Sequence, residues 1–303
     1  MVWTPPVSAA GAWGKLKRAK EHFDVVRTRV EPVDRGDTYR VTLDIAPDTG
    51  EYVFRVQDLE PLDPDWGLII GDCLHNARSA LDHLMVSLFA LATGQEPADI
   101  GNVQFPIHSD PKRFARATVE LRKHPGFSGY MARIEELQPF NWGNTSIWGR
   151  TQLGLPVQSL VGGALERLSR LDNVDKHRIV HPVWLGHAIV GHERIDFPED
   201  FTLEHEDSSG EALENGAEIG RWRFATPLPH EWHPSEVDIK RHFRLEVSLN
   251  EPHLFKGVLE VLPFCLWGSA CVLRLFDPVF ASNGPPLPVT ASLAWEHDYS
   301  IIS

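Results

Sequence analysis

Apolar residues recur along the chain with two different periods. A helical period marks six segments: 11–30, 68–90, 111–123, 128–137, 157–181 and 254–277. A two-residue alternation marks six others, which predict strands: 38–45, 51–57, 187–195, 201–206, 219–225 and 241–249. The first two strands are separated by the turn residues Pro-Asp-Thr-Gly, and we therefore expect them to form a β-hairpin.

This order of elements predicts an α+β fold, a helical bundle with an N-terminal β-hairpin and an antiparallel β-sheet insertion. We expect a single domain over residues 1–303, because no segment within 11–280 has the length and polarity of a linker. Its expected parts are a helical core at 11–182 with the hairpin at 38–57, a β-rich insertion at 183–250, a core helix at 251–280 and a tail at 281–303.

The predicted helix over 68–90 carries an unusual polar face. At about 100° per residue, one narrow stripe collects several short or ring-bearing polar side chains, with Asn76 and Arg78 at its edges: Asp72, His75, Ser79, Asp82 and His83. No Lys, Glu or Gln lies between Asp72 and His83, although such residues normally build a solvated helix face. Groups of this kind hydrogen-bond, transfer protons or ligate metals, so the stripe predicts a site. The alternative is a polar face satisfied by neighbouring helices and buried water.

A second polar group closes the predicted helix over 157–181, in the sequence LDNVDKHRIVH. It contains the candidate supporting residues Asp172, Asn173, Asp175 and His177. The cations Lys176 and Arg178 complement a helix C-terminus, whereas the two Asp have the wrong sign for that position. We therefore expect this helix end to meet the stripe on 68–90.

Composition excludes several classes of function. The formal net charge of −13 disfavours nonspecific binding to duplex DNA, and the 15 His would change that charge near pH 6. Three Cys without a CxxC pair, and no apolar leader, predict a reduced cytoplasmic protein. The apolar run 261–273 contains Pro263 and is short for a bilayer, so we expect a buried core helix and no membrane partner. The chain has no phosphate-binding glycine motif, so no nucleotide cofactor is expected, and the HExH in the loop at 230–233 lacks the spacing of a zinc protease.

The blocks GDCLHNARSALDHL and LDNVDKHR resemble those of an uncharacterised actinobacterial family, over roughly residues 11–182. More distantly, Arg78 and His83 match the R-x4-H spacing of the HEPN superfamily. These are helical proteins, many of them metal-independent ribonucleases whose Arg and His act across a dimer interface. In HEPN ribonucleases the residue after the Arg is usually Asn, Asp or His, and here it is Ser79, a departure from that pattern. The resemblance implies RNA as a partner and a homodimer.

Three hypotheses follow. In the first, a HEPN-like ribonuclease, Arg78 stabilises charge and His83 is the general acid or base, oriented by Asp82 or Ser79 and supported by His75 and His177. In the second, the bundle binds a divalent metal through ligands chosen from His75, His83, Asp82, Asp175 and His177. His75 and His83 lie roughly 12 Å apart along the axis, too far to ligate one metal together. In the third, the polar groups only lock helices together in a non-enzymatic binding or structural module.

Overall fold

The computed structural model describes most of the chain. The described residues are 8–34, 38–46, 48–95, 97, 103–141, 157–180, 182–188, 203–208, 212–225, 243–249 and 257–281. The chain divides into two compact units, described separately below. The first comprises Met1–Phe23, Ile69–Ile179 and Val261–Ser303, and the second comprises Asp24–Leu68 and Val180–Glu260.

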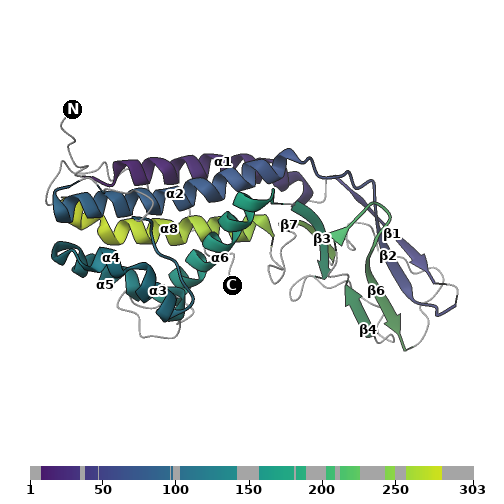
Figure 1. Ribbon diagram of the computed structural model, residues 1–303. Coiled ribbons are helices and arrows are strands. Elements are labelled where there is room, and N and C mark those ends of the chain that lie inside the picture. Colours follow the sequence, from purple (N-terminus) through teal and green to yellow (C-terminus); the bar gives the residue numbers. More distant parts are fainter. Residues whose placement is uncertain are drawn as a thin grey trace. The chain divides into compact units, whose positions relative to one another are not determined.

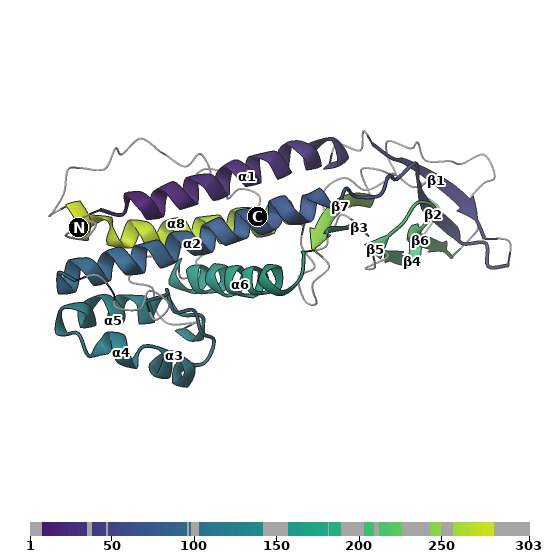
Figure 2. The ribbon, with the colours of Figure 1, turned by 45° about the horizontal axis from the view of Figure 1, so that its top comes forward.

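The first unit is helical. It contains the greater part of four long helices, which run side by side in Figures 1 and 2: α1 (Ala10–Asp34), α2 (Asp65–Thr93), α6 (Val157–His177) and α8 (Val258–Ala281). Shorter helices follow α2: α3 (Pro111–Ala117), α4 (Val119–Arg122) and α5 (Ser128–Glu136), with single 3-10 turns at Pro125–Phe127 and Pro139–Asn141.

The apolar face of α2 is central to the core of this unit. Its fully buried residues recur at helical spacing: Ile70, Leu74, Ala77, Leu81, Leu84, Met85 and Leu88. Small residues let neighbouring helices approach closely. A Cβ on Gly71 of α2 would overlap Asp175 of α6, and a Cβ on Gly268 of α8 would overlap Ala164 of α6. These contacts pack α2 against α6 and α6 against α8.

The second unit contains two antiparallel sheets. The larger has the strand order β1-β2-β6-β4, formed by Arg40–Ile45, Tyr52–Gln57, Glu218–Phe224 and Leu203–Ser208. The smaller has the order β5-β3-β7, formed by Ala212–Leu213, Pro182–Ala188 and Phe243–Leu249. In the larger sheet, the alternation of β2 and β6 gathers aromatic rings on one face: Tyr52, Phe54, Trp222 and Phe224.

A buried carboxylate joins strands β2 and β6. Glu51, which precedes β2, is only 3% exposed and accepts hydrogen bonds from Arg221 and Arg223. Arg221 also forms a two-point contact with Glu218 at 3.0 and 2.9 Å. The two guanidinium groups lower the pKa of Glu51 from 4.5 to about 2. Glu51 is therefore an ionised structural group at neutral pH.

The structure confirms the predicted α+β class, the hairpin and the long helices. Other boundaries were wrong. The helix expected to reach residue 181 ends at His177, and the strand expected to begin at residue 187 begins at Pro182 and is described through Ala188 as β3. Residues 189–195 lie outside the described residues. Proline disfavours a helical conformation of the residue before it but is tolerated as the first residue of a strand. The helix expected over 111–123 is divided at Thr118, whose hydroxyl donates to the carbonyl of Phe114. The single-domain organisation remains a prediction.

The helix predicted over 254–277 is confirmed as α8, which begins and ends four residues later and whose apolar stretch extends beyond the run 261–273. Helix α8 is continuous through Pro263 and Pro278, and Val258–Phe280 is long and apolar enough to cross a membrane by length and composition. Of its most apolar window, 56% is buried within the protein. The core helix of a soluble protein has the same length and composition. The expectation that the protein has no membrane partner therefore stays a prediction.

Candidate functional site

Helices α2 and α6 meet along their polar faces. Asp172 of α6 contacts His75 of α2, and Asp175, three residues later on α6, lies over Gly71, four residues earlier on α2. The two helices therefore run antiparallel at this contact, and each successive turn of one faces a turn of the other. This arrangement confirms that the end of α6 meets the polar stripe of α2.

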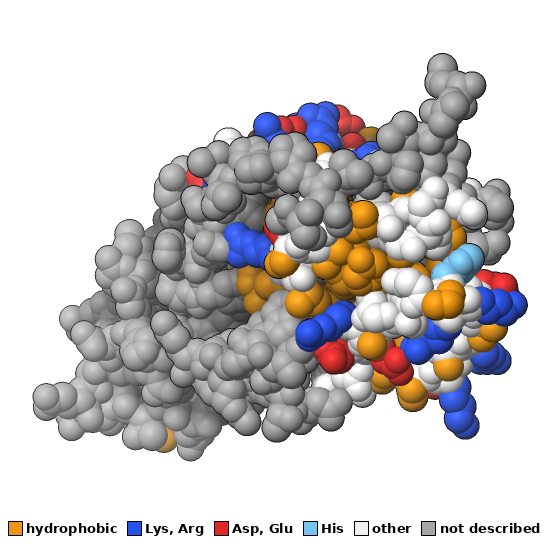
Figure 3. Space-filling view, turned by 90° about the vertical axis from the view of Figure 1, so that its left-hand side faces the viewer, with side chains coloured by type: hydrophobic (Ala, Val, Ile, Leu, Met, Phe, Trp, Pro, Cys, Tyr) orange, Lys and Arg blue, Asp and Glu red, His pale blue; other side chains and the backbone are white. Residues whose placement is uncertain are grey.

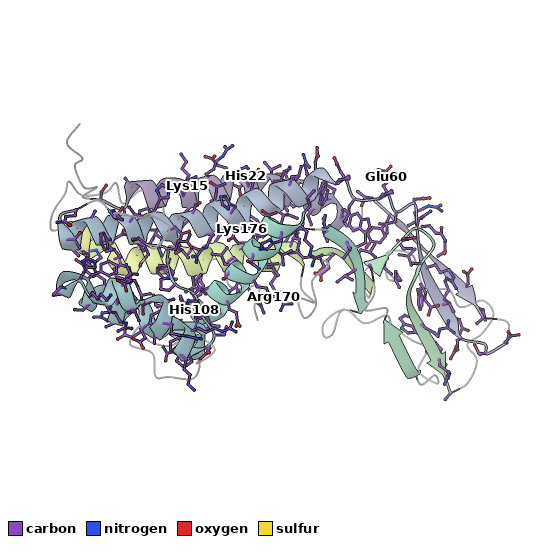
Figure 4. All side chains as sticks on the ribbon, in the orientation of Figure 1. Lys15, His22, Glu60, His108, Arg170 and Lys176 are labelled. Carbon is purple, nitrogen blue, oxygen red and sulfur yellow. The ribbon has the colours of Figure 1, made fainter. Side chains whose placement is uncertain are left out.

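His75 and Asp172 form the centre of the contact. Nδ1 of His75 lies 3.3 Å from Oδ1 of Asp172, and the Nζ of Lys176 lies 2.7 Å from the other carboxylate oxygen. The Asp172 side chain is only 4% exposed, whereas that of His75 is 54% exposed. Lys176, labelled on α6 in Figure 4, is thus the helical neighbour that compensates the buried charge. A neutral His75 that donates Nδ1–H to Asp172 presents Nε2 as a proton acceptor.

A second carboxyl group lies one helical turn away. Cγ of Asp175 would be 2.6 Å from a Cβ on Gly71, so only glycine leaves room for this carboxyl group. Partial burial raises the pKa of Asp175, and the nearby carboxylates of Asp172 and Asp72 raise it further, while His75 and Lys176 oppose the shift. The contact therefore places a proton acceptor and a carboxyl group that holds its proton more tightly than usual on adjacent turns.

Arg78 and Asp82 act together on a different segment. An Nη2–H of Arg78 donates to the carbonyl of Phe105 at 2.6 Å, and Oδ1 of Asp82 accepts the Phe105 N–H at 2.8 Å. The two side chains also pair with each other at 3.1 Å. Burial raises the pKa of Asp82, while Arg78 opposes this shift. This pair fastens the backbone N–H and carbonyl of Phe105 to α2 through Nη2 of Arg78 and Oδ1 of Asp82, while the buried Nη1 of Arg78 has no hydrogen-bond partner among the described residues.

The structure separates the remaining candidates. The exposed His83 lies on the side of α2 that faces α1, where its Nδ1 would be 3.2 Å from a Cβ on Gly11. Asn76 donates to the carbonyl of Asp72, and the half-buried Ser79 has no hydrogen-bonding partner in the described part of the chain. Asn173 and His177 are exposed on α6. The two residues of the R-x4-H spacing, Arg78 and His83, therefore have different neighbours.

The proposed ligand sets do not converge on one point. Among the described residues, no group of three or more His, Cys, Asp and Glu side chains is placed to hold a metal ion. The HExH at 230–233 lies outside the described residues, as do Trp142, Trp148 and Trp232. Trp267 is described and stacks on Phe264, with the ring centroids 6.0 Å apart.

Sequence reasoning missed several residues around the contact. Lys176 was assigned to the helix dipole, yet its ammonium group pairs with Asp172. Gly71 carries no functional group. Its position four residues before His75, on the same side of the predicted helix, was the only sign in the sequence that another helix approaches α2 closely there. The sequence pattern also gave no sign of the contacts made by the segment that follows Phe105. Gln138 binds the N–H of His108 and the carbonyl of Pro106, and the Ser109 hydroxyl donates to Glu166 of α6.

The contact between α2 and α6 offers acid–base chemistry. It combines an exposed imidazole, a buried carboxylate that orients it, and a second carboxyl group with a raised pKa. The neighbouring Arg78 and Asp82 pair maintains the local structure.

No protein-family model matches the chain, and neither the curated proteins nor the solved structures contain a significant match to it.

Proposed function

We propose that this protein is a metal-independent acid–base catalyst that cleaves RNA, with His75 as the residue that transfers the proton. One observation carries the proposal: the imidazole of His75 is half exposed while its Nδ1 is held by the buried carboxylate of Asp172. A carboxylate in that position fixes the tautomer and orientation of an imidazole and stabilises the imidazolium that forms. RNA as the substrate rests on the resemblance to the HEPN superfamily.

RNA suits such a site because it carries its own nucleophile, the ribose 2′-hydroxyl. Nε2 of His75 takes the 2′-hydroxyl proton, the 2′-oxygen forms a bond to the adjacent phosphorus, and the bond from phosphorus to the 5′-oxygen breaks. The leaving 5′-oxygen takes a proton from water. The products are a 2′,3′-cyclic phosphate and a 5′-hydroxyl end. Positioned proton transfer of this kind is worth roughly 10²–10⁴ in rate.

This assignment moves the proton-transfer role from His83 to His75. His83 lies beside Gly11, and no carboxylate within the described residues holds its ring. Nη2 of Arg78 is engaged by Phe105 and Asp82, and its Nη1 is buried. The proposal therefore keeps the substrate class that the R-x4-H spacing implies and places the proton transfer about two turns earlier on the same helix.

The test compares cleavage of a single-stranded RNA by wild type and variants in the presence of a chelator. We expect cleavage in EDTA, a loss of roughly 10²–10⁴ in rate for His75→Ala, and a smaller loss for Asp172→Asn. The matched controls are His83→Ala and His177→Ala, which each remove another exposed imidazole. Equal cleavage by wild type and His75→Ala would overturn the proposal, as would activity that requires added metal.

A thermal unfolding measurement separates catalysis from a purely structural role of His75. The His75 ring is half exposed, and Lys176 still pairs with the buried Asp172 when the ring is removed, so His75→Ala should unfold close to the wild-type temperature. If His75→Ala instead lowers the melting temperature as strongly as a core substitution and no variant changes RNA cleavage, the polar contact only holds the helices together.

A further inference from the structure

We propose that the outward side of α3 binds the phosphate backbone of single-stranded RNA, which adds a substrate-binding surface to the proposed function and rests on it for the nature of the substrate. This surface, the α3 cationic face, consists of Lys112, Arg113 and Arg116. It lies outside the His75 site and on a different helix.

The three cations of the α3 cationic face are exposed and unpaired. None of them forms an ion pair or a side-chain hydrogen bond with any residue that the structure describes. Cations elsewhere in this helical region behave differently: Arg122 pairs with Glu135, Lys123 with Glu120 and Arg133 with Glu136.

The carboxylate of Asp110 accepts the backbone N–H of Lys112, but none of the three cationic side chains pairs with a carboxylate among the described residues, which is unusual in a chain of net charge −13. On the face drawn in Figure 3, Lys and Arg side chains lie along the right-hand edge with Asp and Glu side chains among them. Arg and Lys that are not neutralised within a protein are available to neutralise phosphates.

The fold holds the α3 cationic face in a defined orientation. Phe114 is fully buried, and helical geometry then turns the three cations outward. Asp110 caps the helix by accepting the N–H of Lys112 at 2.9 Å. Because these anchors are rigid, binding a phosphate there does not require the helix itself to become ordered.

The segment leading into α3 is fixed to both helices of the His75 site. Phe105 is held by Arg78 and Asp82 of α2, and Ser109 donates to Glu166 of α6 at 2.8 Å. Glu166 precedes Asp172 by six residues, about 9 Å along α6. Figure 4 labels His108 in this segment and Arg170 on α6. An RNA strand that contacts both His75 and α3 therefore runs along α6 past Glu166.

The test measures equilibrium binding without cleavage. Fluorescence anisotropy of a labelled oligouridylate of ~12 nucleotides is recorded in EDTA, with every protein also carrying His75→Ala. The test variant is Lys112→Gln/Arg113→Gln/Arg116→Gln. The matched control is Arg122→Gln/Lys123→Gln/Arg133→Gln, which removes the same charge from cations that already have carboxylate partners. Circular dichroism confirms that both variants are folded.

Three lost phosphate contacts reduce the slope of log affinity against log salt by about 2 for a single strand. Between about 50 and about 200 mM salt, the protein with an intact α3 cationic face should therefore lose roughly 20-fold more affinity than the test variant. The control variant should keep the steep slope. Equal slopes for both variants would overturn the proposal, and so would binding to anionic phosphatidylserine vesicles in place of RNA.

The two proposals, RNA binding by the α3 cationic face and RNA cleavage by His75, can be refuted independently. If the α3 cationic face binds RNA as expected but no RNA is cleaved, the function proposed for His75 is wrong and the binding surface stands. If the wild type cleaves RNA through His75 but the test variant binds it with unchanged salt dependence, only the binding surface is wrong.

Discussion

Gly71→Ala tests the contact between α2 and α6 on which the site depends. Alanine in the interior of a helix is favoured over glycine by about 1 kcal/mol. Here a Cβ would meet the Asp175 carboxyl group with Cγ at 2.6 Å and Oδ2 at 2.8 Å. Rotating the carboxyl group cannot clear such an overlap, so the whole side chain has to move, and overpacking of this kind costs about 1–3 kcal/mol. We expect the balance to lower the free energy of unfolding by about 1 kcal/mol.

Urea denaturation followed by circular dichroism measures this change, and the chain supplies two controls. Gly14 of α1 has no atom within 4 Å of the corresponding position, so Gly14→Ala should raise the free energy of unfolding by up to about 1 kcal/mol. In an Asp175→Ala background the overlap is gone, and Gly71→Ala should become stabilising as well. The coupling between the two positions is then about 2 kcal/mol. A stabilising Gly71→Ala in the wild-type background would refute the contact.

Three further predictions concern stability. Because Glu51 has its pKa lowered from 4.5 to about 2, its stabilising contribution is complete above pH 4.5 and is lost as pH falls toward 2; Glu51→Gln should flatten that part of a pH–stability curve, and an unchanged acid limb would contradict the reasoning. Asp82→Ala leaves the Phe105 N–H without its acceptor and should cost about 2–3 kcal/mol in denaturant unfolding, whereas Asp82→Asn keeps an acceptor oxygen and should cost less. Gly268→Ala should lower the melting temperature, because its Cβ would overlap Ala164, and a rise would show that α6 and α8 do not approach there.

Local pattern was enough to predict most of the fold. The periods of apolar residues placed the long helices, and alternation with a Pro-Asp-Thr-Gly turn placed the hairpin, because a helix or hairpin buries one face set by neighbouring residues. The same reasoning marked His75, Asp172 and Asp175 as unusual polar residues on two helices. Errors fell at boundaries, as at Pro182 and Thr118, where one residue decides between continuing and ending a helix.

Which polar residues work together was decided only by tertiary structure. The spacing within α2 grouped Arg78 with His83. In the structure the guanidinium of Arg78 donates to the carbonyl of Phe105, 27 residues away, and Gly11 lies beside the imidazole of His83. His75 instead finds its partner 97 residues away, in Asp172. Hydrogen bonds and charge pairs act over a few ångströms in space, and a sequence pattern reports only the neighbours along one helix. The carboxylate that contacts His75 is therefore identified only once α6 is packed on α2.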